Sequence, residues 1–220
     1  ARAAGDSPLV VVIDDLLAAA RTERPAPARD LDPESPAVLL FTSGTTGDPK
    51  AAVILHRHLV AQFEAHRYST GAGEADTLVN WSPLFHNMGL ARAGLATLVY
   101  GWRAVLVPPG LATVRLWLET ITARRATITA SADSGFRAAA ARVDPHGIDL
   151  RSLRYAISGG EGVRADTIAR FERRFGLERI VTPGYGLSEA TLGVAMLRPG
   201  EPLRVDPNGR VTSGRPHQGF

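Results

Sequence analysis

The chain has 220 residues, of which 45% are hydrophobic and 21% are charged, and its formal net charge is +3. This length and composition are those of a globular protein that buries a core without covalent cross-links. Without cysteine the chain has neither disulfides nor thiolate metal ligands. Its apolar runs, such as residues 9–13 and 37–41, are too short to cross a bilayer, and no signal-peptide pattern opens the sequence. We therefore expect a cytoplasmic protein with no membrane span.

The chain divides at a polar stretch with four prolines, "RTERPAPARDLDPESP" at 21–36, which reads as an exposed connector. A short strand and a short helix, 9–13 and 14–21, precede it, so residues 1–35 form a small leading part and 36–220 the main domain. Strands are then predicted at 37–41, 50–55, 77–81, 103–107, 127–130, 153–157 and 179–182, and helices at 57–69, 88–100, 113–124, 131–142 and 164–175. The alternation predicts an α/β fold with largely parallel sheets.

The predicted helix 113–124 shows the clearest periodicity. Its apolar residues Val114, Trp117, Leu118 and Ile121 recur at the spacing of one buried helix face. This helix should cover one face of the sheet.

The loop "TSGTTGDPK" at 42–50 ends on Lys50, the only lysine among 25 lysine and arginine residues. Backbone N–H groups of a glycine-rich turn form an anion-binding concavity, and lysine adds a compact positive charge for phosphate. The spacing GxxGxxK is not that of a Walker A loop, and a strand-like run follows it, so the loop should join two strands. A polar hairpin turn with no ligand is the alternative.

Four further stretches accompany this loop in order: "WSPLFHNMGL" at 81–90, "ISGGEGV" at 157–163, "PGYGLSEATLGVA" at 183–195 and "VTSGRPHQG" at 211–219. Together they resemble the motifs of the adenylate-forming superfamily, which includes acyl-CoA synthetases, fatty acyl-AMP ligases and adenylation domains of peptide synthetases. The resemblance covers residues 36–219. Ala51, where the family usually has glycine, and Ser188, where it often has threonine, are small departures.

The resemblance implies that residues 36–220 are part of the large N-terminal domain of an AMP-forming ligase. Such a ligase activates a carboxylic acid with ATP and Mg²⁺. The product is an acyl-adenylate, whose acyl group passes to coenzyme A or to the phosphopantetheine of an acyl carrier protein. The phosphate-binding residues implied are Thr42, Ser43, Gly44, Thr45, Thr46, Gly47 and Lys50; those bordering the nucleotide are Gly159, Gly160, Glu161, Tyr185, Gly186 and Ser188. Lys50, Ser188 and Glu189 are the implied catalytic residues.

The residue types in "YGLSEA" suit these roles. Tyr185 offers a ring for adenine to stack on, and Ser188 a hydroxyl for the α-phosphate. Glu189 offers a carboxylate oxygen for magnesium. Taken singly, Tyr185 is better explained as a core aromatic and Glu189 as a surface acid, but their place inside this motif favours the functional roles.

The implied acid pocket contains His86, Met88, Gly89 and Gly184. Amino-acid-activating members carry an aspartate beside the aromatic residue of the first motif, whereas here Phe85, His86 and Asn87 include no acid. We therefore expect a fatty or aryl acid and not an amino acid. Coenzyme A and a carrier protein both remain open as acceptors, because the span after the adenine motif is too short for the insertion of fatty acyl-AMP ligases while the phosphate loop is of the CoA-ligase type.

Two alternatives remain. The family's ribose-binding aspartate, hinge and C-terminal lysine are not in the sequence, so residues 1–220 alone should not be a competent enzyme, and a non-catalytic nucleotide-binding or interaction module is possible. The second alternative is nucleic-acid binding, which the calculated pI of 9.8 suggests. Because the arginines alternate with acids and no aromatic stripe accompanies them, we expect no nucleic-acid partner. The other histidines, His56, His58, His66, His146 and His217, show no metal-ligand spacing.

Overall fold

The computed structural model describes residues 30–42, 50–207 and 210–219. Contacts divide the chain into two units, 1–32 and 33–220, and every element below belongs to the second. The strand and helix expected at 9–13 and 14–21 lie outside the described residues. In the part that is described, no helix is both long and apolar enough to cross a membrane.

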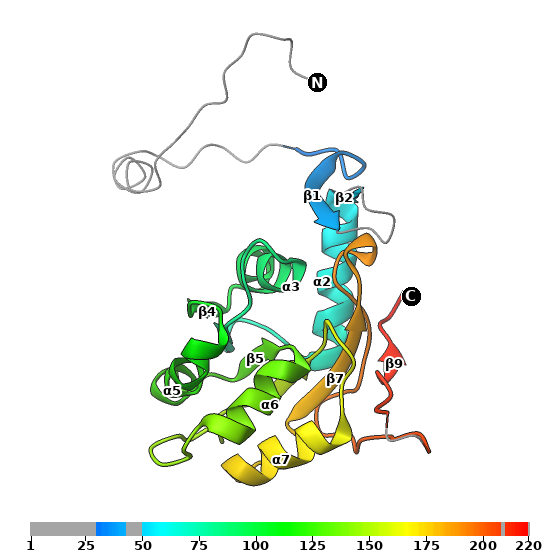
Figure 1. The fold of residues 1–220 in the computed structure, drawn as a ribbon. Coiled ribbons are helices and arrows are strands. Elements are labelled where there is room, and N and C mark those ends of the chain that lie inside the picture. The colour runs from blue at the N-terminus through cyan, green and yellow to red at the C-terminus, as the bar shows by residue number, and fades with distance from the viewer. Residues whose placement is uncertain (1–29, 43–49, 208–209, 220) are drawn as a thin grey trace, which may run out of the picture. The chain divides into compact units, whose positions relative to one another are not determined.

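A seven-stranded sheet forms the centre of this unit (Figure 1). In spatial order its strands are β4 (Arg103–Leu106), β3 (Thr77–Asn80), β5 (Ile128–Ser131), β6 (Tyr155–Ser158), β7 (Val181–Gly186), β8 (Gly193–Met196) and β9 (Arg215–Pro216). The pairs from β4 to β7 are parallel, and β8 and β9 add an antiparallel edge. The prediction of an α/β fold with a largely parallel sheet is confirmed.

Helices cover both faces of this sheet, and the alternation of side chains along the strands assigns them. On β6 the side chains of Tyr155 and Ile157 join one buried cluster and that of Ala156 joins the other. The first cluster contains residues from α2 (His56–Thr70), α3 (Asn87–Gly89), η1 (Leu90–Leu95) and α4 (Ala96–Tyr100), and the second from α5 (Val114–Arg124), α6 (Asp133–Arg142) and α7 (Ala165–Phe175). Figure 1 shows α6 and α7 side by side.

Helix α5 confirms the predicted amphipathic helix. Val114, Trp117, Leu118 and Ile121 are all buried. The Trp117 ring stacks on Trp81 with centroids 4.9 Å apart, and its Nε1 donates to Thr129 Oγ1 at 2.8 Å. The 3₁₀ turn η2 (Leu111–Thr113) precedes this helix.

The single helix expected over 88–100 is divided in the structure. His86 caps its start, because its Nδ1 accepts from the backbone N–H of Met88 at 3.2 Å. Residues 87–89 are α-helical, Leu90–Leu95 form a π-helix and Ala96–Tyr100 return to α-helix. Short π-helical segments inside α-helices occur frequently at functional sites, and this one contains Arg92.

The strand expected at 179–182 is longer than predicted and continues to Gly186, where β8 folds back onto it. Gly186 permits this close return, since a Cβ there would overlap the carbonyl oxygen of Leu192. Strands β8 and β9 were not predicted. The Gln62 side chain of α2 helps to hold β8, because its Oε1 accepts from the Gly193 N–H at 3.0 Å.

Two further strands, β1 (Pro36–Thr42) and β2 (Lys50–Leu55), form an antiparallel pair in which Thr42 faces Lys50. The prediction that the loop joins two strands is therefore confirmed. The loop residues Ser43, Gly44, Thr45, Thr46 and Gly47 lie outside the described residues. The 3₁₀ turn η3 (Ser188–Ala190) packs against both strands.

Candidate active site

The candidate site lies at the carboxyl ends of the parallel strands, which is where ligands bind in α/β sheets. Strands β3 and β6 end on buried polar residues, Asn80 and Ser158. Asn80 Oδ1 and Ser158 Oγ have no hydrogen-bond partner among the described residues. Buried polar atoms without partners are rare in proteins and call for a functional explanation.

A small cavity of about 60 Å³ opens beyond these strand ends. Of the residues expected at the site, it is lined by His86, Met88, Gly159, Gly160, Gly184, Tyr185 and Gly186. They come from α3 with the residue before it, from the turn after β6 and from the end of β7, so three separate sequence motifs meet there. Gly89 does not line the cavity: it is buried against the Pro83 carbonyl, where a Cβ would collide.

A larger cavity of about 1030 Å³ adjoins the small one. Its walls are residues 160–166, the end of β7 and Arg210, Val211 and Ser213. The two cavities share Gly160, Gly184, Tyr185 and Gly186. Two ligands, one in each cavity, could therefore meet at this shared wall.

Tyr185 and Glu161 present different surfaces to the larger cavity. The Tyr185 ring is 54% exposed, so it is not a core aromatic, and a flat group can reach it. The Glu161 carboxylate accepts from the backbone N–H of Ser134 in the first turn of α6, at 2.5 Å. An acid at a helix start is favourable, so Glu161 has a structural role in addition to lining the cavity.

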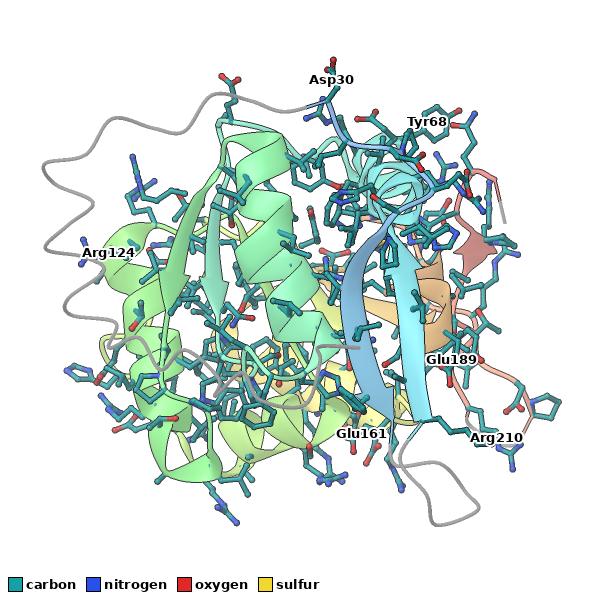
Figure 2. The ribbon with its side chains drawn as sticks, turned by 90° about the horizontal axis from the view of Figure 1, so that it is seen from above. Asp30, Tyr68, Arg124, Glu161, Glu189 and Arg210 are labelled. Carbon is teal, nitrogen blue, oxygen red and sulfur yellow. The ribbon has the colours of Figure 1, made fainter. Side chains whose placement is uncertain are left out.

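The expected phosphate-handling residues lie near one another on β2 and η3. Lys50 is exposed at the start of β2. Ser188 is half-buried and Glu189 exposed on η3, which contacts β1 and β2; Figure 2 labels Glu189 beside this strand pair. Thr42 is the last residue of β1.

No group of three or more His, Cys, Asp or Glu residues that could hold a metal ion occurs within the described ranges. A magnesium ion nevertheless fits Glu189, since Mg²⁺ commonly takes one or two carboxylates and completes its shell with water and substrate phosphates. The Glu189 side chain is exposed and makes no hydrogen bond or ion pair with the residues that the structure describes. Its carboxylate oxygens are thus available to a cation.

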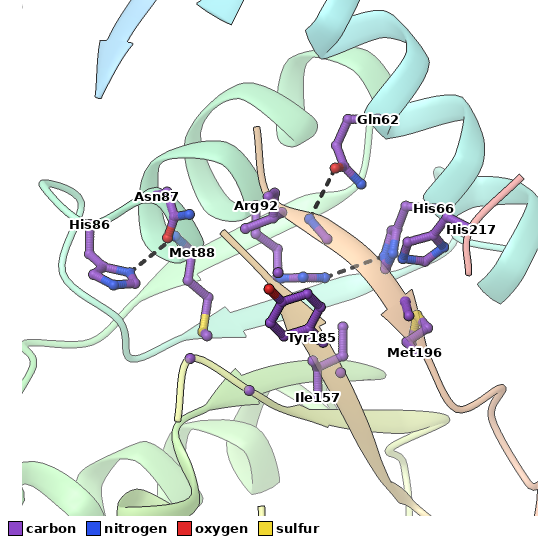
Figure 3. A pocket seen from close by; sticks show the side chains of 17 residues that line it. Gln62, His66, His86, Asn87, Met88, Arg92, Ile157, Tyr185, Met196 and His217 are labelled. Carbon is purple, nitrogen blue, oxygen red and sulfur yellow. Dashed lines mark hydrogen bonds between the residues drawn. The ribbon is translucent and has the colours of Figure 1, made fainter. Parts of the chain in front are cut away.

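Apart from the half-buried Asn87, four polar residues of the small cavity were not predicted as site residues from the sequence: Gln62, His66, Arg92 and His217. All four are buried. The one signal that could have indicated them is Arg92, which interrupts the otherwise apolar run "MGLARAGLA". Figure 3 shows Arg92 extending toward His66, whose Nε2 lies 3.4 Å from Arg92 Nη1.

Burial controls the protonation of these groups. Desolvation, with Arg92 and His217 adding repulsion, holds the pKa of His66 well below its ordinary value. Desolvation, Arg92 and Arg198 together lower the pKa of His217 to about 4. Both imidazoles are therefore neutral at pH 7, and because arginine only donates, Nε2 of His66 is the acceptor in its contact with Arg92.

Two cavities that meet at the carboxyl edge of a parallel sheet define a ligand-binding α/β domain. The chain belongs to the AMP-binding enzyme family, whose model matches residues 3–219. It is 34% identical over 213 residues to long-chain-fatty-acid–AMP ligase FadD26 of Mycobacterium marinum, covering 90% of this chain and 36% of the relative. It is 33% identical over 215 residues to 4-hydroxyphenylalkanoate adenylyltransferase of the same organism, covering 91% and 34%.

Among solved structures, the fold resembles the fatty acyl-adenylate ligase from L. pneumophila crystallised with acyl adenylate and pyrophosphate. The TM-score is 0.73 with 27% identity, covering 85% of this chain and 36% of that chain. The present chain thus spans little more than a third of the length of the relatives that it matches.

Proposed function

We propose that this chain carries the acid-activating site of an AMP-forming ligase. In the proposed reaction a carboxylate oxygen attacks the α-phosphorus of ATP. A new oxygen–phosphorus bond forms, the bond to the bridging oxygen breaks, and pyrophosphate leaves with that electron pair. The observation that carries the proposal is the wall shared by the two cavities, because it lets an acid in one approach a nucleotide in the other.

The sizes of the cavities support one assignment of ligands. The larger cavity, at about 1030 Å³, has room for a nucleotide and exposes the Tyr185 ring for a base to stack on. The smaller cavity has mixed walls, with Ile157 and Met196 beside polar side chains, and would take the acid. Gly160 and Gly184 let the backbone of the shared wall approach both ligands.

The phosphates would lie toward the β1–β2 connection, with Lys50 and Ser188 as donors. A bound magnesium ion would neutralise charge on the phosphate oxygens, and Glu189 is the residue to hold it. Little covalent chemistry is required of the protein, so positioning and charge neutralisation account for the catalysis. Adenylate-bound relatives of the same family support this reading.

The acid should lack an α-amine. Among the described residues, no aspartate or glutamate lines the small cavity, so an ammonium group there would have no carboxylate partner among them and would lie beside buried Arg92. Burying an unpaired charge costs several kcal/mol.

We propose coenzyme A or a carrier-protein thiol as the acceptor of the acyl group. A purely structural or non-catalytic role is not favoured, since the relatives described above are named as a ligase and an adenylyltransferase.

The variant Glu189→Gln tests the assignment of the magnesium ligand. Its amide keeps the shape but binds a divalent cation less well. Loss of one charged contact, worth about 1.5–3 kcal/mol, should slow acid-dependent ATP–pyrophosphate exchange about 10- to 100-fold. The assay uses the full-length gene product that contains residues 1–220.

Glu178→Gln is the matched control, because Glu178 is also an exposed glutamate, paired only loosely with Arg179 at 3.6 Å. It should exchange pyrophosphate at the wild-type rate. Equal rates for the two variants would exclude Glu189 from the reaction.

A further inference from the structure

Arg92 is a buried charge for which the chain provides no counter-charge among its described residues. It is 6% exposed and lines the small cavity. Among the residues that the structure describes, its Nε has no hydrogen-bond partner, and its Nη1 lies 3.4 Å from Nε2 of the neutral His66 ring. Arginine stays protonated in proteins, so this guanidinium remains positive inside the fold.

The groups around Arg92 are polar but uncharged. Tyr155 and Tyr100 lie close enough to influence it electrostatically, and burial raises the pKa of Tyr155 to about 12 and also raises the pKa of Tyr100. Tyr100 already donates its hydroxyl to the Phe63 carbonyl at 2.5 Å. None of these side chains offers a negative charge at pH 7. Removing one partner from a buried ion pair is strongly unfavourable, so an isolated buried guanidinium indicates a missing anion.

The position of Arg92 shows where that anion would bind. Arg92, His66, Gln62 and His217 line the small cavity only, whereas Gly160, Gly184, Tyr185 and Gly186 also face the larger one. An acid with its reacting carboxylate at the shared wall therefore has its other end among the residues that line the small cavity alone. The π-helix η1 carries Arg92 at this end.

The cavity is also small. Its volume of about 60 Å³ is less than half of that of a cavity that binds benzene, about 150 Å³. Without side-chain movement neither an aryl ring nor a long alkyl chain has room here.

We propose that Arg92 binds a second carboxylate at the far end of a short dicarboxylic acid, so that the protein activates such acids in preference to fatty or aryl acids. This inference rests on the proposed acid-activating function. Arginine donates two parallel hydrogen bonds to a carboxylate, and Arg92 has an Nε without a partner. Neutral His66 and His217 provide further polar atoms beside the bound group.

The test is ATP–pyrophosphate exchange by the full-length gene product with matched acids. Malonate, succinate and glutarate are each compared with the monocarboxylic acid of equal carbon number (propionate, butyrate and valerate), and octanoate and benzoate are included. We expect kcat/KM for at least one dicarboxylic acid to exceed that of its partner at least 10-fold. Arg92→Met should abolish this preference and Arg92→Lys should restore part of it. Arg124→Met, an exposed arginine on α5, should leave it unchanged.

The outcomes separate the two proposals. Exchange that is fastest with octanoate or benzoate, or an acid preference that Arg92→Met leaves unchanged, would overturn the role of Arg92 while acid activation stands. An absence of exchange with every acid would overturn acid activation itself. If Arg92→Met does not fold, as judged by circular dichroism, the wild-type preference and the Arg92→Lys variant decide the question.

Discussion

His66 and His217 are buried histidines that the fold keeps neutral. Their ring centroids lie 6.1 Å apart, and burial, with Arg92 as a second cause, lowers the pKa of both. A second positive charge beside the Arg92 guanidinium would be unfavourable, so neutral rings are the form compatible with the fold. The same neutrality leaves Arg92 as the positive charge available to a ligand in this cavity.

The lowered pKa values predict how stability depends on pH. Between pH 6.5 and about 4 the unfolded chain binds a proton at His217 that the folded chain does not, so the free energy of unfolding decreases as pH falls. The loss approaches about 1.4 kcal/mol per pH unit for each histidine that remains neutral in the folded state. Urea unfolding at several pH values measures this slope.

Two variants identify the source of the slope. His217→Gln should make it shallower in this pH range, whereas His146→Gln, at an exposed histidine, should not change it. An equal slope in wild type and His217→Gln would show that His217 is not the group responsible. The Asp149 and Asp166 carboxyls, whose pKa values are lowered by neighbouring arginines, contribute only at more acidic pH.

Gly186 tests the close return of β8 onto β7. In Gly186→Ala the new methyl group meets the Leu192 carbonyl, and such overpacking costs about 1–3 kcal/mol. Gly162→Ala is the matched control, since a Cβ there meets no atom within 4 Å. Thermal unfolding should show a lower Tm for Gly186→Ala alone. Equal Tm values would mean that the backbone around Gly186 relaxes without cost.

At the scale of the element, α5 stabilises one face of the sheet through Trp117. Trp117→Ala removes a fully buried ring, its stacking on Trp81 and its hydrogen bond to Thr129. The expected loss is about 3–5 kcal/mol in the free energy of unfolding. Leu116→Ala on the same helix, where the side chain is 45% exposed, should change it by less than about 0.5 kcal/mol. Similar losses from both variants would contradict the orientation of α5.

The elements that could be predicted from the sequence are those with a local signal. Helix α5 shows its buried face in its own periodicity, and the glycine-rich stretch between β1 and β2 has the composition of a turn. The division of 88–100 into α- and π-helix could not be predicted. The π-helix η1 differs from an α-helix in its backbone hydrogen bonds, and the periodicity of the side chains does not indicate this difference. Strand β8 was missed because three of its four residues are only half-buried and its support, the Gln62 side chain, comes from a distant helix.

The same reasoning applies to the site. Tyr185, Gly184 and Gly160 belong to short motifs and could be identified in advance, and the structure brings them to one wall. Arg92, His66 and His217 come from three distant segments, so their meeting in one cavity required the fold. Their chemistry was visible in the sequence only as an arginine inside an apolar run.

At the scale of the whole molecule, the parallel sheet brings the motifs together. Its strands end at one edge, the turn after β6 and the end of β7 form the wall between the two cavities, and η3 connects this wall to the β1–β2 pair. In the proposed reaction, a carboxylate and a nucleotide on either side of that wall are positioned for attack on the α-phosphate. This arrangement is what the family resemblance and the cavities jointly support.

The most direct test of this account is acid-dependent ATP–pyrophosphate exchange by the full-length gene product that contains this chain. We predict that incorporation of labelled pyrophosphate into ATP requires a carboxylic acid without an α-amine and requires magnesium. Exchange that proceeds with α-amino acids, or no exchange with any acid by a folded protein that binds ATP, would contradict it.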